Sequence, residues 1–196
     1  MGKVATGFST SLDGFAALPN GNVGPLFDWY FAGDTEYMVP GGNFTLRVSA
    51  QSAELLSESY GRMGALVVGR RHFDHAKGWG GRHPMRVPVF VVTHTVPREW
   101  IYEGSPFVFV TDGVESAVER AKDAAGSKDV GVGGADVAQQ CIGASLVDEV
   151  GLDLVPVLLG EGVRFFDRLR TRPVQLERTT VIEAPGVTHL RFRVVK

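Results

Sequence analysis

The turn Gly133-Gly134 is the first place in this sequence where residue type and position suggest a chemical role. The two glycines follow the short apolar run 130–132 and precede a helical pattern that starts near residue 136. Because glycine has no side chain, a phosphate can approach the backbone, and the free N–H groups and dipole of a helix N-terminus favour its negative charge. Two glycines also form ordinary tight turns, so the local pattern leaves both interpretations open.

A second predicted strand end, Gly69-Arg70-Arg71, has the same arrangement with two cations added. A guanidinium group fits a pyrophosphate or a ribose 2′-phosphate through two parallel hydrogen bonds. Cations at a helix N-terminus oppose the helix dipole, so two of them favour an anionic partner over two solvated side chains. Two anion sites at the ends of two parallel strands indicate one extended ligand with several phosphates, such as a dinucleotide.

The segment Ser11-Leu12-Asp13-Gly14 follows the first apolar strand. A carboxylate at this position can anchor a polar ring or order a loop over a cofactor. An aspartate before glycine is also common in plain turns, and the segment by itself does not separate these roles.

Metal and nucleophile chemistry are less favoured by the pattern. A His-x-x-His spacing on a helix, as at His72 and His75, can place two metal ligands on one face. Only Asp74 and His83 lie near enough in sequence to add to them, and no cysteine or second carboxylate completes a set, so we expect no metal. Cys141 lies within a predicted helix and is expected to be a small core residue.

The elements that must position these residues alternate between strands and helices. Predicted strands cover 3–8, 65–68, 87–93, 107–110, 130–132 and 150–157, and predicted helices cover 50–62, 72–77, 113–125 and 136–144. This alternation indicates an α/β fold, a mostly parallel sheet flanked by helices. Two final strands, 174–182 and 188–195, flank a turn and end the chain in an antiparallel hairpin. Ligands of open α/β sheets bind outside the carboxyl ends of the strands, where the three segments above are expected to meet.

Composition limits the class of protein. The 196 residues are 44% hydrophobic and 21% charged, which fits one globular domain spanning 1–196. A net charge of −2 gives no basic excess for nucleic acid or an anionic membrane, and no apolar run approaches the roughly 20 residues of a membrane-spanning helix. The N-terminus lacks the apolar core of a signal peptide, and a single cysteine allows no internal disulfide, so we expect a cytoplasmic protein.

Four segments in order resemble the C-terminal reductase domain of the bifunctional riboflavin-biosynthesis deaminase-reductase and its stand-alone relatives in the dihydrofolate reductase superfamily. Each segment is modest alone, and the ordered set is specific and spans the chain from residue 3 to the end. The resemblance implies a dihydrofolate reductase-like fold and NADPH as the cofactor. The segments are Ser11-Leu12-Asp13-Gly14-Phe15-Ala16, Leu66-Val67-Val68-Gly69-Arg70, Val130-Gly131-Val132-Gly133-Gly134 and Leu146-Val147-Asp148-Glu149-Val150, the last running on to residue 162.

The resemblance also implies roles for individual residues. In the superfamily the strand-Gly-Arg-helix junction holds the NADPH phosphates, and a glycine-rich turn lies under the pyrophosphate. The loop after the first strand closes over the nicotinamide, and a later strand end meets the adenosine. The cofactor-binding residues implied here are Ser9, Leu12, Gly14, Ala16, Gly69, Arg70, Arg71, Thr93, His94, Gly133, Gly134, Ala135, Asp136 and Val137.

Departures from the family pattern bear on the substrate. His72 stands where the family has a threonine, and Ala135 replaces the third glycine of the turn. Folate-reducing members carry an acid on the preceding helix at a position that falls here on Ala53, with Glu54 about 100° further round the helix. Folate reduction is therefore not expected unless the alignment shifts by one residue. The aromatic segment 25–45 is longer than the family predicts and is expected to reshape the substrate pocket.

The favoured function is NADPH-dependent hydride transfer to a small planar heterocycle of the pterin, pyrimidine or flavin-precursor kind. Asp13 or an ordered water is the expected general acid, and Phe31 and Trp79 either stack on the substrate or pack in the core. The alternative is a non-catalytic nucleotide-binding module of the same fold. A hydrolase or deaminase would need a nucleophile motif or zinc ligands that the sequence lacks. Relatives are often dimers, and the run 150–159 with the terminal hairpin is the expected homodimer interface.

Overall fold

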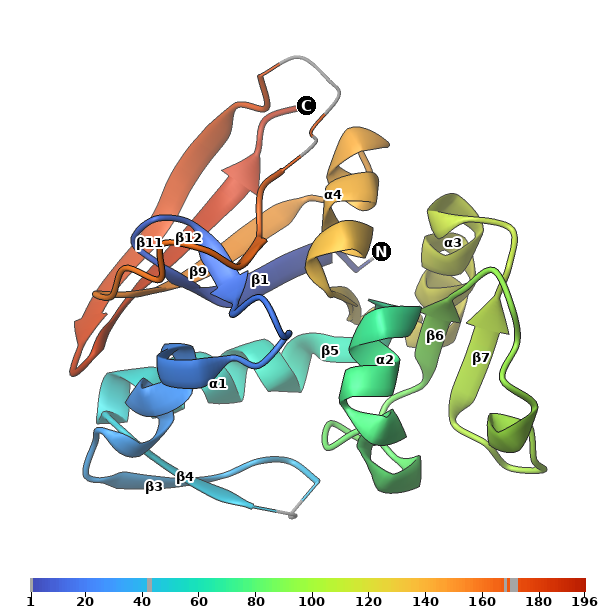
Figure 1. Ribbon diagram of the computed structural model, residues 1–196, viewed down its shortest axis with the longest axis horizontal. Helices are drawn as coiled ribbons and strands as arrows, with labels where there is room; N and C mark the ends of the chain where they lie inside the picture. Colours follow the sequence, from blue (N-terminus) through green and yellow to red (C-terminus); the bar gives the residue numbers. More distant parts are fainter. Residues whose placement is uncertain (1, 42–43, 168, 170–172) are drawn as a thin grey trace.

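The computed structural model describes residues 2–41, 44–167, 169 and 173–196. Its centre is an eight-stranded sheet in the order β11-β12-β9-β1-β8-β5-β6-β7 (Figure 1). The six strands from β9 to β7 run parallel, β12 is antiparallel to β9, and β11 is antiparallel to β12. The predicted fold class, a mostly parallel sheet ending in an antiparallel hairpin, is confirmed. The strands are β1 Val4–Ser11, β5 Met63–Gly69, β6 Val89–Val92, β7 Phe107–Val110, β8 Asp129–Gly133, β9 Glu149–Val155, β11 Leu176–Ala184 and β12 Val187–Val194.

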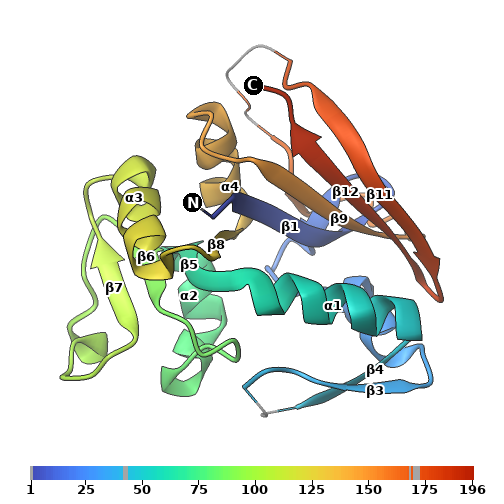
Figure 2. The ribbon, with the colours of Figure 1, turned by 180° about the vertical axis from the view of Figure 1, so that it is seen from behind.

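Helices cover both faces of this sheet (Figures 1 and 2). On one face α3 (Val114–Ala125) and α4 (Ala135–Gly143) pack over a single large core cluster that includes Cys141, as expected. Burial raises the pKa of the Cys141 thiol to about 12, so this residue is an inert core side chain. On the other face lie α1 (Ala50–Arg62) and α2 (Arg70–His75), each over a cluster of its own.

The two clusters on the α1 and α2 face are separate. One lies between α1, β9, β12 and the segment after β1, and it contains Leu26, Trp29 and Leu56. The other lies between α2 and β5, β6 and β7, and it contains Phe73 and Phe107. Between them the central strands β1 and β8 carry small residues on this face, and of these Gly7 is exposed.

The segment 25–45, which the sequence leaves irregular, folds into short elements. A 3-10 helix, η1 (Gly24–Phe31), is followed by a two-stranded hairpin of β3 (Thr35–Met38) and β4 (Thr45–Val48). Leu26 and Trp29 of η1 and Leu46 of β4 are buried in the cluster under α1. The sequence shows no clear period here because the elements are short and only scattered side chains face inward.

Two of the element boundaries that differ from the prediction bear on the candidate site. β1 continues to Ser11, although the sequence predicts a strand ending at residue 8, because Ser9 to Ser11 pair with β9 and are buried despite their polar side chains. α2 begins at Arg70 rather than His72, so both arginines lie in its first turn. Shorter elements complete the fold: β2 (Phe15–Ala17) pairs with β10 (Val163–Arg164), and η2 (Lys77–Gly81) and η3 (Arg98–Trp100) follow α2 and β6.

Candidate functional site

A row of glycines crosses the middle of the sheet on the face shared by α1 and α2. Gly7 of β1 pairs with Gly151 of β9, and Gly133 of β8 follows Val132, the partner of Thr6. Gly7 is exposed although β1 is a central strand, and Gly151 and Gly133 are half-buried. The other face of these strands is covered by the core under α3 and α4. The exposed floor is therefore on the α1 and α2 side, between the two helices.

Arg191 of β12 borders this floor at one end. It pairs with Gly151, and a Cβ on Gly151 would lie 3.3 Å from Cδ, Nε and Cζ of Arg191. The guanidinium therefore lies directly over the bare glycine. Both of its terminal nitrogens donate to Asp153 Oδ1 at 3.0 Å, and Nη1 also donates to the carbonyl oxygens of Leu152 and Leu190.

A buried polar chain continues behind this pair. His189 Nδ1 lies 2.7 Å from Asp153 Oδ1, and its Nε2 lies 2.8 Å from Ser52 Oγ on α1. Burial alone would raise the pKa of Asp153, and the hydrogen bond from His189 and the charge of Arg191 hold it below its usual range. Ser52 and His189 are almost fully buried, so the chain fixes α1 to β9 and β12 rather than offering a nucleophile.

His72 of α2 borders the other end of the floor. A Cβ on Gly133 would lie 3.4 Å from His72 Cε1. Burial lowers the pKa of His72 and the nearby His75 lowers it further, so the ring is neutral at pH 7. Its ring lies 5.7 Å from that of Trp79 and 6.2 Å from that of Phe8, and within the described ranges no hydrogen bond reaches its ring nitrogens.

Trp79 is held in an unusual backbone conformation. Residues 77 to 81 all have positive φ values, including the non-glycine residues Lys77 (φ 48°) and Trp79 (φ 50°). A non-glycine residue in this region costs roughly 1–2 kcal/mol, so the surrounding packing must hold it. The Trp79 ring packs 4.6 Å from that of His83, whose pKa is lowered to about 4, first by burial and then by His72.

The start of α4 fits a phosphate group. Gly134 is the N-cap at φ 90°, and no side chain caps the helix, so its first N–H groups are free of side-chain acceptors. α2 begins beside it, at Gly69, also without a side-chain cap. A Cβ on Gly69 would lie 3.0 Å from Val137 Cγ2, so this glycine allows the two helix starts to approach. Gly69, Gly133, Gly134 and the first turn of α4 would hold the pyrophosphate of NADPH, the group that the fold family implies.

The two arginines at the start of α2 differ in their surroundings. Arg70 Nε donates to both oxygens of Asp74 at 2.8 Å, and its Nη1 donates to the carbonyl oxygen of Thr95 at 3.1 Å. Arg70 therefore already has an acidic partner one turn along the helix, and the phosphate contact expected for it stays a prediction. Arg71 is exposed and, in the part of the chain that the structure describes, makes no ion pair.

Asp13 does not have the environment of a general acid. Its carboxylate accepts the backbone N–H groups of Gly160 at 2.7 Å and Leu159 at 3.2 Å. The Ser11 hydroxyl and then these N–H groups lower its pKa to about 2. An ionised carboxylate with these backbone partners holds two loops together, and the catalytic role expected for Asp13 stays a prediction.

The other residues expected around the nicotinamide have structural roles. Ser9 Oγ accepts a hydrogen bond from Trp29 Nε1 at 3.0 Å and faces the cluster under α1. Gly14 turns the chain at φ 87°, and Ala16 is buried in the core below α4. Leu12, directly after the end of β1, is 64% exposed.

The residues expected near the adenosine lie at the end of β6. The Thr93 hydroxyl closes a turn by donating to the carbonyl oxygen of Thr95 and accepting its N–H, and His94 is exposed beside it. Arg70 donates to the same carbonyl oxygen, so the ends of β5 and β6 are joined. On α4, Ala135 is half-buried and Asp136 is exposed, accepting a hydrogen bond from the Gln140 side chain.

Phe31 and Trp79, the two expected substrate-stacking residues, lie in different parts of the fold. Phe31 ends η1 and is 66% exposed, whereas Trp79 packs with the aromatic residues below α2. Trp79 borders the glycine floor through its contact with His72. Arg191 and Asp153 were not expected at this site, and His72 was considered only as a metal ligand and as a departure from the family pattern. The signal for Arg191 was the alternation His189-Leu190-Arg191 on a terminal strand, which places His189 and Arg191 on the same face.

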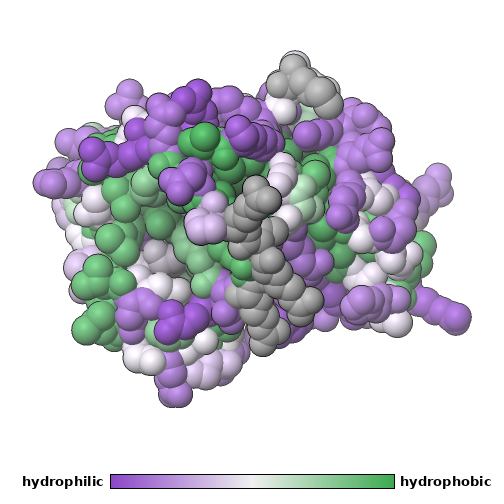
Figure 3. All heavy atoms as spheres, turned by 90° about the horizontal axis from the view of Figure 1, so that it is seen from above, coloured by the Kyte–Doolittle hydropathy of each residue, from purple (hydrophilic) through white to green (hydrophobic). Residues whose placement is uncertain are grey.

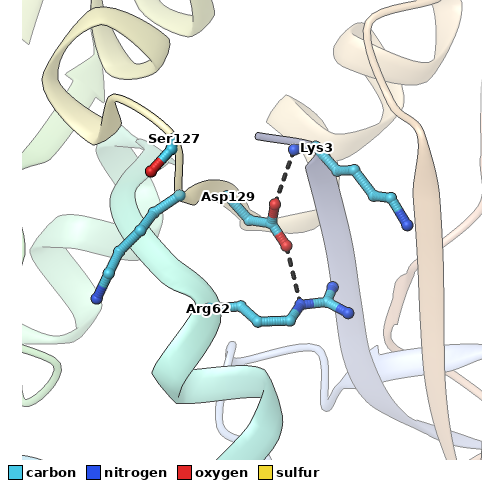
Figure 4. Close-up of a pocket in the computed structure, with 5 residues that line it drawn as sticks. Lys3, Arg62, Ser127 and Asp129 are labelled. Carbon is cyan, nitrogen blue, oxygen red and sulfur yellow. Dashed lines mark hydrogen bonds and ion pairs between the residues drawn. The ribbon is translucent and has the colours of Figure 1, made fainter. Parts of the chain in front are cut away.

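A depression lined mostly by charged residues lies at the opposite end of the strands. It has a volume of about 340 Å³, and in Figure 4 the carboxylate of Asp129 lies between Lys3 and Arg62. The Lys3 backbone N donates to Asp129 Oδ1 at 2.8 Å, and Arg62 Nε lies 2.9 Å from Oδ2 as an ion pair without hydrogen-bond alignment. Glu149 also pairs with the Lys3 and Arg62 side chains, so these two cations are already paired within the protein.

Other expectations concern metals, membranes and partners. Across the described ranges no group of three or more histidine, cysteine or acidic side chains is arranged to hold a metal ion. No helix in the part searched is both long and apolar enough to cross a membrane. Figure 3 shows apolar side chains among hydrophilic ones on the end of the molecule that carries β11 and β12, and Leu176 and Val181 of β11 are exposed. The homodimer interface expected there stays a prediction.

The sheet order and the helix placement are those of the dihydrofolate reductase-like fold of α/β proteins. Residues 3–188 match the RibD C-terminal domain, and the chain belongs to that family. The family includes NADPH-dependent pyrimidine reductases.

Individual relatives are distant in sequence. The uncharacterized protein YwjB of Bacillus subtilis (strain 168) is 24% identical over 174 residues, which cover 85% of this chain and 84% of that protein. A provisionally assigned riboflavin biosynthesis protein from Shewanella sp. PV-4 superposes with a TM-score of 0.74 at 22% identity, covering 99% of both chains. The deaminase/5-amino-6-(5-phosphoribosylamino)uracil reductase of Thermotoga maritima gives a TM-score of 0.63 at 14% identity, with 99% of this chain covering 57% of that one. At these identities the likeness to solved structures concerns the fold.

Proposed function

We propose that this protein is an NADPH-dependent oxidoreductase that reduces a small planar heterocycle of the pterin, pyrimidine or flavin-precursor kind. The observation that carries the proposal is the position of the exposed Gly7 floor directly beside the uncapped start of α4 at Gly134. A dinucleotide phosphate held at α4 leaves its reactive ring beside an exposed floor without side chains, where a second flat ring can lie.

The chain's own residues supply binding, orientation and exclusion of water. The N–H groups at the start of α4 and the Arg71 guanidinium hold phosphate groups. NADPH, when bound, supplies the hydride. Asp13 holds the loop after β1 against the loop after β9, which shapes the edge of the site.

The proton for a reduced C=N bond comes from an ordered water in this proposal. Asp13 is ionised at neutral pH, and the neutral His72, which borders the glycine floor, can orient such a water. Trp79, packed against His72, covers this side from solvent.

The alternative is a nucleotide-binding module without catalysis, and a two-stage experiment separates it from a reductase. Calorimetric titration with NADPH first tests for cofactor binding. NADPH oxidation is then followed at its absorbance band with a panel of pterins, pyrimidines and flavin precursors. Binding with turnover of one substrate supports the proposal, and binding without turnover of any supports the module. No NADPH binding by the folded protein overturns both.

A further inference from the structure

We propose that Arg191 and His72 form the two sides of a substrate slot over Gly7, and that Arg191 selects a neutral ring whose facing edge carries carbonyl oxygens. This inference rests on the proposed function and specifies the ring that it reduces. It concerns Arg191, which lies outside the four family segments, and His72, which stands where the family has a threonine.

The slot follows from strand register. Arg191 pairs with Gly151, Gly151 pairs with Gly7, and Gly133 lies on the far side of Gly7. The Arg191 guanidinium covers Gly151 and the His72 ring covers Gly133, which leaves Gly7 as the exposed element between them. Neighbouring strands are roughly 4.8 Å apart, so two steps separate β9 from β8 by about 10 Å. A flat ring system lying on Gly7 would meet a nitrogen-bearing group at each edge.

Arg191 is fixed in place before any ligand binds. Asp153 Oδ1 accepts from both terminal nitrogens, and His189 Nδ1 lies 2.7 Å from the same oxygen. In the described part of the chain the Arg191 Nε–H has no acceptor, and the Arg191 side chain is 25% exposed. A rigid guanidinium with an unused donor loses little conformational freedom when it binds.

The charge balance decides which ligand edge fits. Arginine carries only hydrogen-bond donors, so the facing edge of the ligand must offer acceptors. The charge of Arg191 is already offset by Asp153 at 3.0 Å, so a neutral carbonyl fits better than a phosphate or carboxylate. A ring with amino groups on that edge would bring donor against donor.

The His72 side adds no charge. Burial lowers its pKa, and its two ring nitrogens, one a donor and one an acceptor when neutral, have no partner within the described residues. Arg191 therefore discriminates between a ligand edge that carries acceptors and one that carries donors, whereas His72 can pair with either kind.

Two pteridines of the same ring shape test the proposal. Lumazine presents carbonyl oxygens at positions 2 and 4, and 2,4-diaminopteridine presents amino groups there. Their affinities for the wild-type protein saturated with NADP⁺ are measured by fluorescence titration. We expect lumazine to bind about tenfold or more tightly than 2,4-diaminopteridine. The reason is that lumazine gains a charge-assisted hydrogen bond from Arg191, whereas the diamino compound leaves donors unpaired. Equal affinities, or preference for the diamino compound, would overturn the proposal without any variant.

Variants then assign the preference to Arg191. Arg191→Lys keeps a cation beside Asp153 but loses the planar fork, and Arg191→Met removes the charge. In both, the lumazine preference is expected to fall to about threefold or less, with NADP⁺ affinity unchanged. Arg193→Met is the matched control, because Arg193 lies two residues along the same strand, is exposed and pairs with Glu177. A full preference retained in folded Arg191→Lys and Arg191→Met also overturns the proposal. Loss of NADP⁺ binding in the wild type would instead count against the proposed function.

Discussion

The carboxylate of Asp13 lies 2.7 Å from the backbone nitrogen of Gly160, and this hydrogen bond joins the loop after β1 to the loop after β9. The two residues are 147 positions apart in the chain. The ionised Asp13, which belongs to the motif after β1, therefore holds the two loops together at the edge of the candidate site.

The first prediction concerns the protonation of Asp13. Its pKa of about 2 in the folded protein lies below the ordinary aspartate value of 3.8, so ionised Asp13 stabilises the fold above about pH 4. This contribution is lost as the pH falls towards 2. The difference in urea-unfolding free energy between wild type and Asp13→Asn should be constant from neutral pH to about pH 4 and shrink below it. A carboxyl pKa above 5 in a carbon-13 NMR titration would restore Asp13 as a candidate general acid.

The second prediction concerns Gly134. This residue has φ 90°, and a Cβ on it would lie 3.3 Å from His72 Cβ. Gly134→Ala should lower NADPH affinity about tenfold or more, because strain is added where the phosphate is expected. Gly126→Ala is the control, since Gly126 also has a positive φ, of 63°, and its Cβ would meet nothing within 4 Å. The two variants should lose similar thermal stability, and equal NADPH affinity in both would mean that the Gly134 turn is only structural.

The third prediction separates the two arginines of α2. Arg71→Gln should reduce the preference for NADPH over NADH about tenfold or more, because the exposed Arg71 is available for the 2′-phosphate. Arg70→Gln should change that ratio less, since Asp74 already binds Arg70 at 2.8 Å. Calorimetric titration of both variants with both nucleotides gives the two ratios. The reverse order of effects would assign the phosphate to Arg70.

The fourth prediction concerns stability in mild acid. Burial lowers the pKa of His83 to about 4, and His83 Nδ1 accepts the N–H of Met85 at 3.2 Å. The unfolded chain takes up this proton near pH 6.5, so the contribution of neutral His83 is complete above that pH and is lost as the pH falls towards 4. The loss is up to about 3 kcal/mol. His83→Gln should flatten this part of the unfolding free energy against pH, and the exposed His94→Gln should leave it unchanged.

The fifth prediction concerns dihydrofolate. Ala53 occupies the position expected for the pterin-binding acid and packs in the cluster under α1, while Glu54 is exposed. A pterin amino group left unpaired costs roughly 1–3 kcal/mol, so dihydrofolate should be a poor substrate. Steady-state assays should find the same low rate in wild type and Glu54→Gln. A turnover of about 1 per second or more that is lost in Glu54→Gln would identify a folate reductase.

Much of the secondary structure could be predicted because its signals are local. Helix 50–62 and strand 107–110 have the same bounds in sequence and structure, and Ser49 caps α1 by accepting the N–H of Ser52. The end of β1 could not be predicted in this way. Ser9 to Ser11 look like a loop, but they are buried strand residues whose partners lie in β9.

The candidate site shows the same division. Glycines at strand ends are visible in the sequence, and they mark Gly69 and Gly133 at the start of helices. The pairing of Arg70 with Asp74 follows a helical spacing and could have been anticipated once the helix start was placed correctly. The contact of Asp13 with Gly160 could not, because the loop carrying Gly160 is brought there by β9.

The sequence by itself determined the alternation of strands and helices, the terminal hairpin and the glycine-marked strand ends, because each depends on residues close together in the chain. Only the tertiary structure decided that Arg191 lies over Gly151 and that Gly7 is left exposed beside them. These residues belong to β12, β9 and β1, and their register is set by packing between elements far apart in sequence. No local pattern carries that register, which is why the substrate slot is visible only in the folded protein.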